Sequence, residues 1–284
     1  MPKGIVISNK SNLYKVEQNN IIYDCNARGK FKNEDISPVA GDKVEIEIID
    51  SEKKSGVITE IHERFNFLKR PKMANLSQLI LVISMKLPKP DLLLLDKQLA
   101  YSELIKVKPI ICLNKIDLES EKKVDEIYNL YTKIGYKVIK TNAKTGEGID
   151  EIKSILNNNI TAFSGNSGVG KSSLINKILD NDTTLEGSIS EKNKRGKNTT
   201  TQVTLYKIGT DSYIADTPGF STFEITEIDK KDLANYFKEF KPYIGECEFA
   251  DCKHIKEENC AIKNAVKEGF ISTDRYERFL NLLK

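Results

Sequence analysis

The sequence has no tryptophan, two histidines, five cysteines and eight prolines among its 284 residues. It also lacks long apolar runs. None approaches the roughly 18 residues of a membrane-spanning helix, so we expect no membrane partner. The opening residues MPKGIVISNK contain no apolar core of the kind that marks a secretory signal peptide. Without an export signal, five cysteines do not predict a disulfide framework, and we expect a cytoplasmic protein.

An excess of charge of either sign is also missing. The chain carries 44 Lys and Arg against 41 Asp and Glu, a formal net charge of +3. This excess is too small to indicate a nucleic-acid partner by itself. With 39% hydrophobic and 30% charged residues, the composition is that of a folded protein and not of a disordered chain. The length predicts two or three domains.

Up to about residue 67 the sequence favours short strands. Clusters of Asn, Gly, Pro and Lys separate five runs: GIVIS, LYKVEQ, IIYDCN, KVEIEIID and GVITEIHE. Alternation is clearest at Val44, Ile46 and Ile48. Five short strands within residues 1–68 predict an OB-like β-barrel, although an SH3-like barrel would give much the same pattern. Residues 63–72 are expected to form a connector.

The pattern changes after this connector. Residues 69–222 alternate between strand-like apolar runs and helix-like segments at 91–105, 121–134 and 149–156, which is typical of a mostly parallel α/β sheet. Residues 223–284 carry two apolar stripes with the i, i+3, i+4, i+7 spacing of helices. The sequence therefore predicts a multidomain chain with a barrel, a central α/β domain and a mainly helical C-terminal domain.

The most specific motif is a phosphate-binding loop. The sequence GNSGVGKS satisfies G-x-x-x-x-G-K-[ST] at every position and lies between a strand-like and a helix-like run. Glycines let such a loop turn tightly, so that its N–H groups converge on phosphate oxygens. Lys171 would pair with the β- and γ-phosphates and the Ser172 hydroxyl would hold Mg²⁺. The alternative, a chance glycine-rich turn, is disfavoured by this context. The predicted nucleotide contacts are Gly165, Asn166, Ser167, Gly168, Val169, Gly170, Lys171, Ser172 and Ser173.

A second motif, D-T-P-G at residues 216–219, follows another strand-like run. An aspartate at the end of a strand downstream of a phosphate loop helps to hold the metal, so Asp216 is a predicted Mg²⁺ residue. Gly219 would offer its N–H to the γ-phosphate. Alone, such a sequence is usually a turn, and only its pairing with the phosphate loop gives it this meaning.

The identity of the base depends on a third motif, N-K-I-D at residues 114–117. The Asp117 carboxylate can accept hydrogen bonds from guanine N1–H and the 2-amino group, which adenine lacks. Asn114 can tie this loop to the phosphate loop, and the Lys115 stem can cover the ring. Downstream, the Ala143 N–H could contact guanine O6. The predicted base contacts are Asn114, Lys115, Ile116, Asp117, Asn142, Ala143 and Lys144. A P-loop ATPase with an accidental N-K-I-D sequence remains the alternative.

Three of the five cysteines and one of the two histidines fall within 14 residues. Cys247, Cys252, His254 and Cys260 have the spacing C-x4-C-x-H-x5-C. Three thiolates and an imidazole form a usual ligand set for closed, tetrahedral zinc, so we predict one structural Zn²⁺ ion. Reduced buried cysteines or a redox pair are the alternatives, and neither gives His254 a reason to be there.

The order of the motifs is informative. The base motifs at 114 and 142 come first, followed by the phosphate loop at 165, a Thr-rich segment near 200 and D-T-P-G at 216. Ras-like GTPases contain the same elements, but their phosphate loop, switch I and D-x-x-G precede the two base motifs. The order in this chain is therefore a circular permutation of the Ras-like order. In these motifs the chain resembles the circularly permuted ribosome-biogenesis GTPases, and the resemblance covers nearly its whole length.

This resemblance implies a GTPase that binds the small ribosomal subunit and its rRNA, acts late in subunit maturation, and hydrolyses GTP to GDP and phosphate faster on the subunit. It implies a zinc-binding domain at residues 223–284, and we expect this domain to move when GTP is hydrolysed. It also implies a monomer that binds GTP, Mg²⁺ and Zn²⁺. A GTP-sensing RNA-binding scaffold is the alternative from another functional class.

The residue that would activate water differs from that of Ras-like proteins. Phe220 follows D-T-P-G where Ras-like proteins have a glutamine, so it cannot orient water. The segment RGKNTTT at 195–201 matches the switch I region of the family, with Asn198 at the position of its histidine. Thr200 is expected to hold Mg²⁺ and the γ-phosphate. The catalytic candidates are therefore Thr200, Asn198 and Gly219. Gly168 stands where potassium-dependent GTPases have Asn, so no cation activator is predicted.

Overall fold

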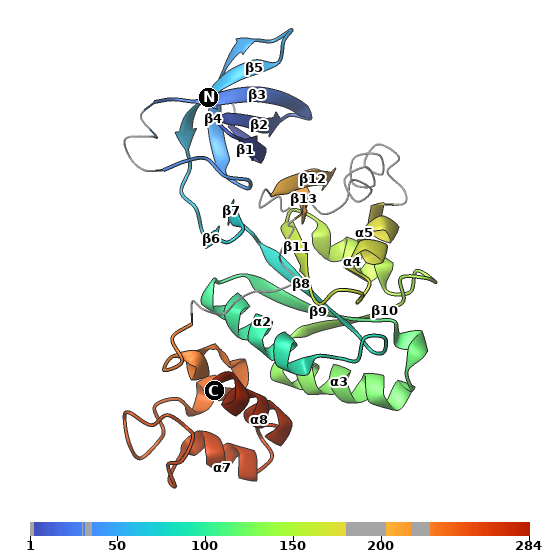
Figure 1. The fold of residues 1–284 in the computed structure, drawn as a ribbon, viewed down its shortest axis with the longest axis vertical. Helices are drawn as coiled ribbons and strands as arrows, with labels where there is room; N and C mark the ends of the chain where they lie inside the picture. Colours follow the sequence, from blue (N-terminus) through green and yellow to red (C-terminus); the bar gives the residue numbers. More distant parts are fainter. Residues whose placement is uncertain (1–2, 30, 32–35, 180–202, 217–227) are drawn as a thin grey trace. The chain divides into compact units, whose positions relative to one another are not determined.

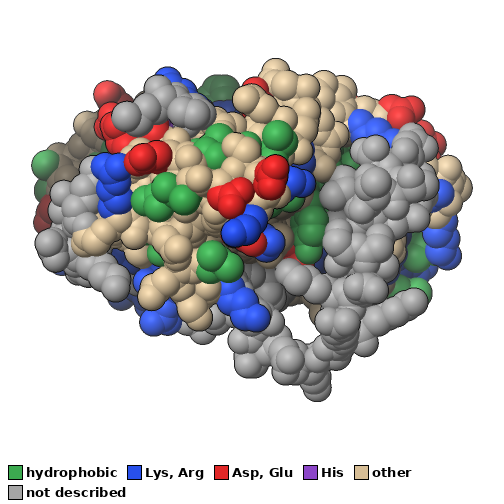
Figure 2. All heavy atoms as spheres, turned by 90° about the horizontal axis from the view of Figure 1, so that it is seen from above, with side chains coloured by type: hydrophobic (Ala, Val, Ile, Leu, Met, Phe, Trp, Pro, Cys, Tyr) green, Lys and Arg blue, Asp and Glu red, His purple; other side chains and the backbone are tan. Residues whose placement is uncertain are grey.

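The computed structural model describes residues 3–29, 31, 36–179, 203–216 and 228–284. Its contacts divide the chain into two compact units, neither of which is a continuous stretch of sequence. Unit 1 comprises residues 1–80, 149–164 and 172–221, and unit 2 comprises residues 81–148, 165–171 and 222–284. No helix within the described ranges is long and apolar enough to cross a membrane. Figure 2 shows acidic and basic side chains interspersed over the coloured part of one face.

Five strands of unit 1 form a closed barrel (Figure 1): β1 (Lys3–Lys10), β2 (Leu13–Gln18), β3 (Ile21–Ala27), β4 (Lys43–Asp50) and β5 (Ser55–Ile61). Strand β1 pairs antiparallel with β2 and with β4, and β3 pairs in parallel with β5. The order β1-β2-β3-β5-β4 therefore closes on itself. Val6, Val16 and Val44 are fully buried inside it. The predicted OB-like barrel is confirmed.

The expected connector at residues 63–72 contains a short hairpin. Strand β6 (Phe67–Lys69) pairs antiparallel with β7 (Lys72–Ala74). The sequence did not predict these two strands within the connector, because three-residue strands are too short to show alternation. Contacts with the segment before β4 hold the hairpin in place, including a parallel bridge between Ala40 and Met73.

The remainder of unit 1 is α/β. Strands β11 (Ile160–Ser164) and β13 (Ser212–Asp216) run in parallel, and β12 (Thr204–Gly209) pairs antiparallel with β13. Helix α4 (Ile149–Leu156) precedes β11, and α5 (Lys171–Leu179) follows the loop after it. Because β11 and β13 are parallel neighbours, the chain leaves both strands at the same edge of the sheet.

Unit 2 contains the other half of the α/β fold. Its strands lie in the order β10-β9-β8, formed by β10 (Lys137–Thr141), β9 (Lys108–Asn114) and β8 (Gln78–Ser84), of which residues 78–80 fall in unit 1. Every residue of β8 is buried, as expected for a strand covered on both faces. Figure 1 shows α2 (Leu92–Leu104) and α3 (Glu121–Ile134) running beside these strands. The predicted α/β alternation is confirmed.

The C-terminal part of unit 2 is mainly helical, with η2 (Leu233–Tyr236), η3 (Lys238–Tyr243), α7 (Ala261–Lys267) and α8 (Thr273–Leu282). Its core contains the rings of Phe237, Phe240 and Phe279, whose centroids lie 5.0 to 5.3 Å apart. The apolar stripe at residues 233–240 suggested one α-helix. The structure instead has two 3₁₀ helices separated by extended Phe237, and Pro242 within η3 lacks the N–H that an α-helix would use.

A buried ionic cluster joins α8 to α2. Asp96 of α2 accepts hydrogen bonds from Arg275 and Arg278 of α8 and from the Tyr131 hydroxyl. The Arg275 guanidinium also donates to both carboxylate oxygens of Glu239, at 2.6 and 3.0 Å. The side chains of Asp96 and Arg275 are 0% and 1% exposed. Two carboxylates thus face two guanidinium groups, and Asp96 and Arg275 at the centre are shielded from water while Arg278 is 14% exposed.

Candidate nucleotide site and metal centre

The predicted phosphate loop lies between β11 and α5, and Lys171 is the first residue of that helix. The Lys171 ammonium donates hydrogen bonds to the carbonyls of Gly165 and Asn166, at 2.6 and 2.9 Å, so it lies within the turn of the loop. Burial lowers the pKa of Lys171 below its ordinary value. A half-buried ammonium at a helix N-terminus can bind a polyphosphate strongly, because a negative partner compensates its desolvation.

Asn114, at the end of β9, connects three loops. Its Nδ2 donates to the Val169 carbonyl of the phosphate loop at 2.9 Å. Its Oδ1 accepts from the Ala143 N–H at 3.3 Å and from the Thr141 hydroxyl at 3.2 Å. The residue is 1% exposed, so these bonds form away from solvent and fix the geometry of the loops. The structure thus brings together the two base motifs and the phosphate loop within unit 2.

The contact with Asn114 explains the second invariant glycine of the phosphate-loop motif. Gly170 has a backbone φ of +103°, and a Cβ atom at this position would lie 2.2 Å from Asn114 Nδ2. Such a distance is well inside van der Waals contact, and a positive φ is also strained for other residues. Only glycine lets the Asn114 side chain reach the loop.

Lys115 closes the base loop over the phosphate loop. Its own backbone is left-handed, with φ of +59°, and its ammonium donates to the Gly168 carbonyl at 2.7 Å and to the Leu87 carbonyl. Asp117 follows in the short helix η1 (Ile116–Leu118) and is solvent-exposed. The carboxylate that would read the base is therefore accessible to an incoming ligand.

The loop at 142–144 is shaped by its own asparagine. Asn142 is 4% exposed, and its Oδ1 accepts from the backbone N–H groups of Lys144 and Thr145, at 3.0 and 3.4 Å. The Ala143 N–H, which the sequence assigned to guanine O6, donates to Asn114. In this structure Asn142 thus forms the turn that places the other two residues of the motif.

Asp91 was missed by the sequence reasoning. Its Oδ1 accepts from the Leu94 N–H at 2.9 Å and caps α2, while its Oδ2 accepts from Asn166 Nδ2 of the phosphate loop at 3.1 Å. An aspartate directly before an apolar helical run is a recognisable N-cap. The second bond joins residues 75 positions apart and has no local signal.

The predicted magnesium residues are only partly described. Asp216 is the last residue of β13, and the neighbouring strand β11 leads into the phosphate loop. Ser172 and Ser173 are exposed at the start of α5. Asn198, Thr200 and Gly219 lie outside the described residues.

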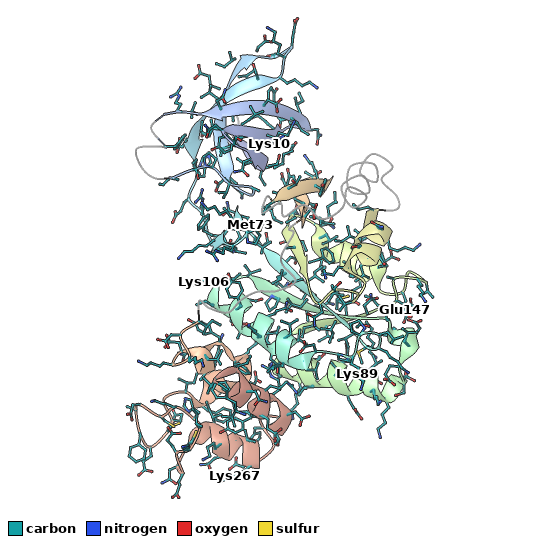
Figure 3. The ribbon with its side chains drawn as sticks, in the orientation of Figure 1. Lys10, Met73, Lys89, Lys106, Glu147 and Lys267 are labelled. Atoms are coloured by element: carbon teal, nitrogen blue, oxygen red, sulfur yellow. The ribbon has the colours of Figure 1, made fainter. Side chains whose placement is uncertain are left out.

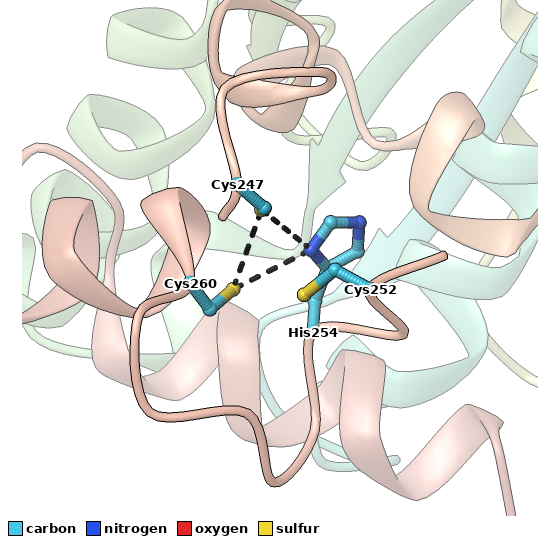
Figure 4. Close-up of side chains that lie close together, drawn as sticks. All are labelled: Cys247, Cys252, His254 and Cys260. Atoms are coloured by element: carbon cyan, nitrogen blue, oxygen red, sulfur yellow. Dashed lines mark hydrogen bonds between the residues drawn. The ribbon is translucent and has the colours of Figure 1, made fainter. Parts of the chain in front are cut away.

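The four predicted metal ligands converge in the C-terminal part of unit 2 (Figure 4). Their donor atoms all lie within 4.8 Å of one another. His254 Nδ1 is 3.5 Å from Cys247 Sγ and 3.4 Å from Cys260 Sγ, and these two sulfurs are 3.9 Å apart. A tetrahedral ion with metal–sulfur bonds of about 2.3 Å separates its sulfurs by about 3.8 Å and a sulfur from an imidazole nitrogen by about 3.5 Å. The cluster therefore fits one tetrahedral metal ion.

The surroundings of the cluster favour the ligating form of the histidine. Burial lowers the pKa of His254, which keeps the imidazole neutral and able to donate a lone pair. The Tyr276 hydroxyl of α8 donates to the His254 carbonyl at 2.8 Å and fixes its backbone, whose φ is +60°. Such outer contacts orient metal ligands.

Comparison with known proteins agrees with these features along the whole chain. A family model described as RsgA GTPase matches residues 61–226, and one described as RsgA N-terminal domain matches residues 3–58. The small ribosomal subunit biogenesis GTPase RsgA of Caldanaerobacter subterraneus subsp. tengcongensis is 42% identical over 282 residues, covering 99% of this chain and 95% of that protein. Its namesake from Alkaliphilus metalliredigens is 39% identical, covering 100% and 97%.

Two solved structures are similar throughout. The crystal structure of YjeQ from Thermotoga maritima gives a TM-score of 0.86 at 37% identity and covers 99% of this chain and 97% of its own. YloQ, described as a circularly permuted GTPase, gives a TM-score of 0.81 at 33% identity, covering 100% and 94%. The permuted order deduced from the motifs is thus the order of an established fold.

Proposed function

Because the chain belongs to the RsgA GTPase family, we propose that it hydrolyses GTP to GDP and phosphate and acts in biogenesis of the small ribosomal subunit. The observation that supports this most strongly is the position of Asn114. One buried amide bonds both the phosphate loop and the second base loop, so the elements that bind phosphate and guanine are organised as one site.

The proposed roles within this site follow from its geometry. Lys171 and the N–H groups of the phosphate loop bind the β- and γ-phosphates, while Asp117 reads the guanine edge and Lys115 covers the ring. Mg²⁺ is proposed to be held by Ser172 and Thr200, with Asp216 acting through water, where it would neutralise phosphate charge. The remaining proposed nucleotide contacts are those predicted from the sequence.

Guanine specificity is tested by Asp117→Asn. An amide in place of the carboxylate cannot accept two hydrogen bonds from N1–H and the 2-amino group, so GTP affinity should fall while affinity for xanthosine triphosphate rises. A matched control is Glu121→Gln, an exposed carboxylate at the start of α3 whose loss should leave both affinities unchanged. Competition by ATP as strong as that by GTP would favour a P-loop ATPase instead.

The metal in the cysteine cluster is proposed to be zinc with a structural role. Cys247, Cys252, His254 and Cys260 fill all four positions of a tetrahedral ion, which leaves none open for a substrate. Soft thiolates combined with an imidazole select zinc over the oxygen-preferring cations. The ion would hold the loop between η3 and α7, in which the structure assigns no helix or strand.

The proposed organisation is a barrel at residues 1–68, a permuted GTPase domain at 69–222 and a zinc-binding domain at 223–284. We propose a cytoplasmic monomer whose partners are the small subunit, its rRNA and GTP or GDP. Asn198, Thr200 and Gly219 are proposed to arrange the attacking water. A Lys171→Ala chain that still supports subunit maturation would favour a GTP-sensing scaffold over an enzyme.

A further inference from the structure

The hairpin β6–β7 has one buried face and one face that is exposed except at Ala74, which lies opposite Phe67. Leu68 and Met73 are directly opposite one another, and their side chains are 1% and 0% exposed. Figure 3 labels Met73 on this hairpin. The intervening positions, Phe67, Lys69 and Lys72, are exposed. Because successive side chains of a strand point to opposite faces, these three residues share the outer face.

The outer face and the tip carry uncompensated positive charge. Lys69, Arg70 and Lys72 are all exposed, and none forms an ion pair with any residue that the structure describes. Lys69 and Lys72 are moreover direct cross-strand partners. Like charges placed opposite one another destabilise a pair of strands. An anion bound between them would relieve this repulsion.

The hairpin is held firmly at its base. Asn66 exchanges two hydrogen bonds with the backbone of Leu76, at 2.8 and 3.0 Å, and Ala74 N donates to Ala40 O at 2.9 Å. Arg64 forms two 2.7 Å bonds to the fully buried carboxylate of Asp42. The positive tip is therefore presented in a fixed geometry, which lowers the entropic cost of binding a partner.

Two aromatic side chains flank the positive charges. Phe65 and Phe67 are 58% and 40% exposed, and the Arg64 guanidinium lies 4.9 Å from the centre of the Phe67 ring. Exposed aromatic rings beside unpaired cations are the combination with which proteins bind single-stranded nucleic acid, through stacked bases and neutralised phosphates. An acidic peptide would use the cations but would give no role to the two rings.

We propose that this hairpin binds single-stranded RNA, with Lys69, Arg70 and Lys72 on backbone phosphates and Phe65 and Phe67 stacked on bases. The inference rests on the proposed function in that the natural RNA would be a segment of small-subunit rRNA. It adds a contact surface outside both the nucleotide site and the barrel strands.

The test measures binding of the full chain to a fluorescent single-stranded RNA 20-mer as a function of salt. The variant Lys69→Gln/Lys72→Gln should bind about tenfold more weakly at low salt, and its slope of log affinity against log salt should fall by about 1.4, since each lost phosphate contact on a single strand contributes about 0.7. Phe67→Leu should weaken binding about tenfold with no change in slope.

The matched control is Lys122→Gln/Lys133→Gln, which removes the same charge from exposed positions of α3. GTP affinity of both double variants should equal that of the parent chain, and neither variant should be less stable to heat, since Lys69→Gln/Lys72→Gln removes a repulsion between strands. If the two double variants bind RNA equally well, the inference is overturned. Poly-glutamate that displaces the RNA from the parent chain but not from the Lys69→Gln/Lys72→Gln variant would overturn it as well, because the hairpin would then prefer an acidic protein.

GTP turnover with small subunits is measured in parallel. If the parent chain binds the RNA through its hairpin but shows no GTPase activity, the proposed function fails and the hairpin assignment stands. If turnover and stimulation are normal and the hairpin variant binds RNA like the control variant, the hairpin assignment alone fails.

Discussion

Replacing Asp96 by asparagine should be among the most damaging conservative substitutions in the chain. The carboxylate is 0% exposed and accepts hydrogen bonds from Arg275, Arg278 and Tyr131. Asparagine keeps the shape but removes the charge and turns an amide N–H₂ toward a donor. The buried Arg275 guanidinium would then keep only the carboxylate of Glu239, and the partly buried Arg278 guanidinium would lose its bond to a charged carboxylate. Removing one partner from a buried ion pair costs about 3–5 kcal/mol.

A matched control is available between α2 and η3. Glu103 accepts a 2.7 Å bond from Lys241, whose side chain is 50% exposed. Because water screens this pair, Glu103→Gln should cost at most about 1 kcal/mol. Burial, and not the mere presence of an ion pair, is therefore the variable that distinguishes the two substitutions.

The assay is equilibrium unfolding in urea, followed by far-ultraviolet circular dichroism and by tyrosine fluorescence, since the chain has no tryptophan to obscure it. Asp96→Asn should lower the free energy of unfolding by about 3–5 kcal/mol. An additional Arg275→Met substitution should cost less in the Asp96→Asn background than in the parent chain, because the two residues share one interaction. Equal losses for Asp96→Asn and Glu103→Gln would refute the reasoning.

Three further predictions concern the nucleotide loop, the metal and the barrel. Gly170→Ala should lower the affinity for a fluorescent GTP analogue at least about tenfold, because the alanine Cβ would collide with the Asn114 amide. Unchanged affinity would contradict the proposed role of Asn114. Metal analysis should find one zinc ion per parent chain and none in Cys260→Ser, and a full complement in that variant would contradict the proposed ligand set. Although burial of Glu17 raises its pKa, hydrogen bonds from Lys207 and Tyr213 leave the pKa below its ordinary value. The stability that this carboxylate contributes is therefore present above the unfolded-state pKa of about 4.3 and lost as the pH falls toward the folded-state value. Glu17→Gln should flatten the pH dependence of urea midpoints measured from pH 6 to pH 3, and a profile like that of the parent chain would contradict this role.

The parts of the site that could be predicted from the sequence are those whose chemistry fixes residue types at fixed spacing. A phosphate loop needs its glycines, lysine and hydroxyl within eight positions, and a tetrahedral metal needs four ligands within reach of one ion. The barrel was predictable because its strands are long enough to alternate, and Val44 and Ile46 are buried as their spacing indicates, although Ile48 at the next alternate position is exposed.

The parts that could not be predicted depend on contacts distant in sequence. Asp91 reaches Asn166 across 75 positions, and Asp96 reaches Arg275 across 179. Neither pair leaves a local pattern, because each partner alone looks like an ordinary polar residue of a helix. The stripe at residues 233–240 misled for another reason. Apolar residues at i, i+3 and i+4 suit two consecutive 3₁₀ turns as well as one α-helix, and packing of Phe237 and Phe240 against Phe279 favours the former.

The movement expected for residues 223–284 on GTP hydrolysis is opposed by contacts within unit 2. The C-terminal helices are joined to α2 by the buried Asp96 cluster, and the first turn of α2 is joined to the phosphate loop by Asp91. A movement of the C-terminal part against α2 would have to break buried ionic bonds. Hydrogen exchange compared between GDP and a GTP analogue should therefore differ more at residues 240–270 in Asp96→Asn than in the parent chain.

The most direct measurement is GTP turnover by the purified chain with and without purified small ribosomal subunits. We expect slow hydrolysis by the chain alone, a marked rise when subunits are added, and loss of activity in Lys171→Ala under both conditions. A turnover rate unchanged by small subunits, or activity that persists without Lys171, would contradict the proposed function.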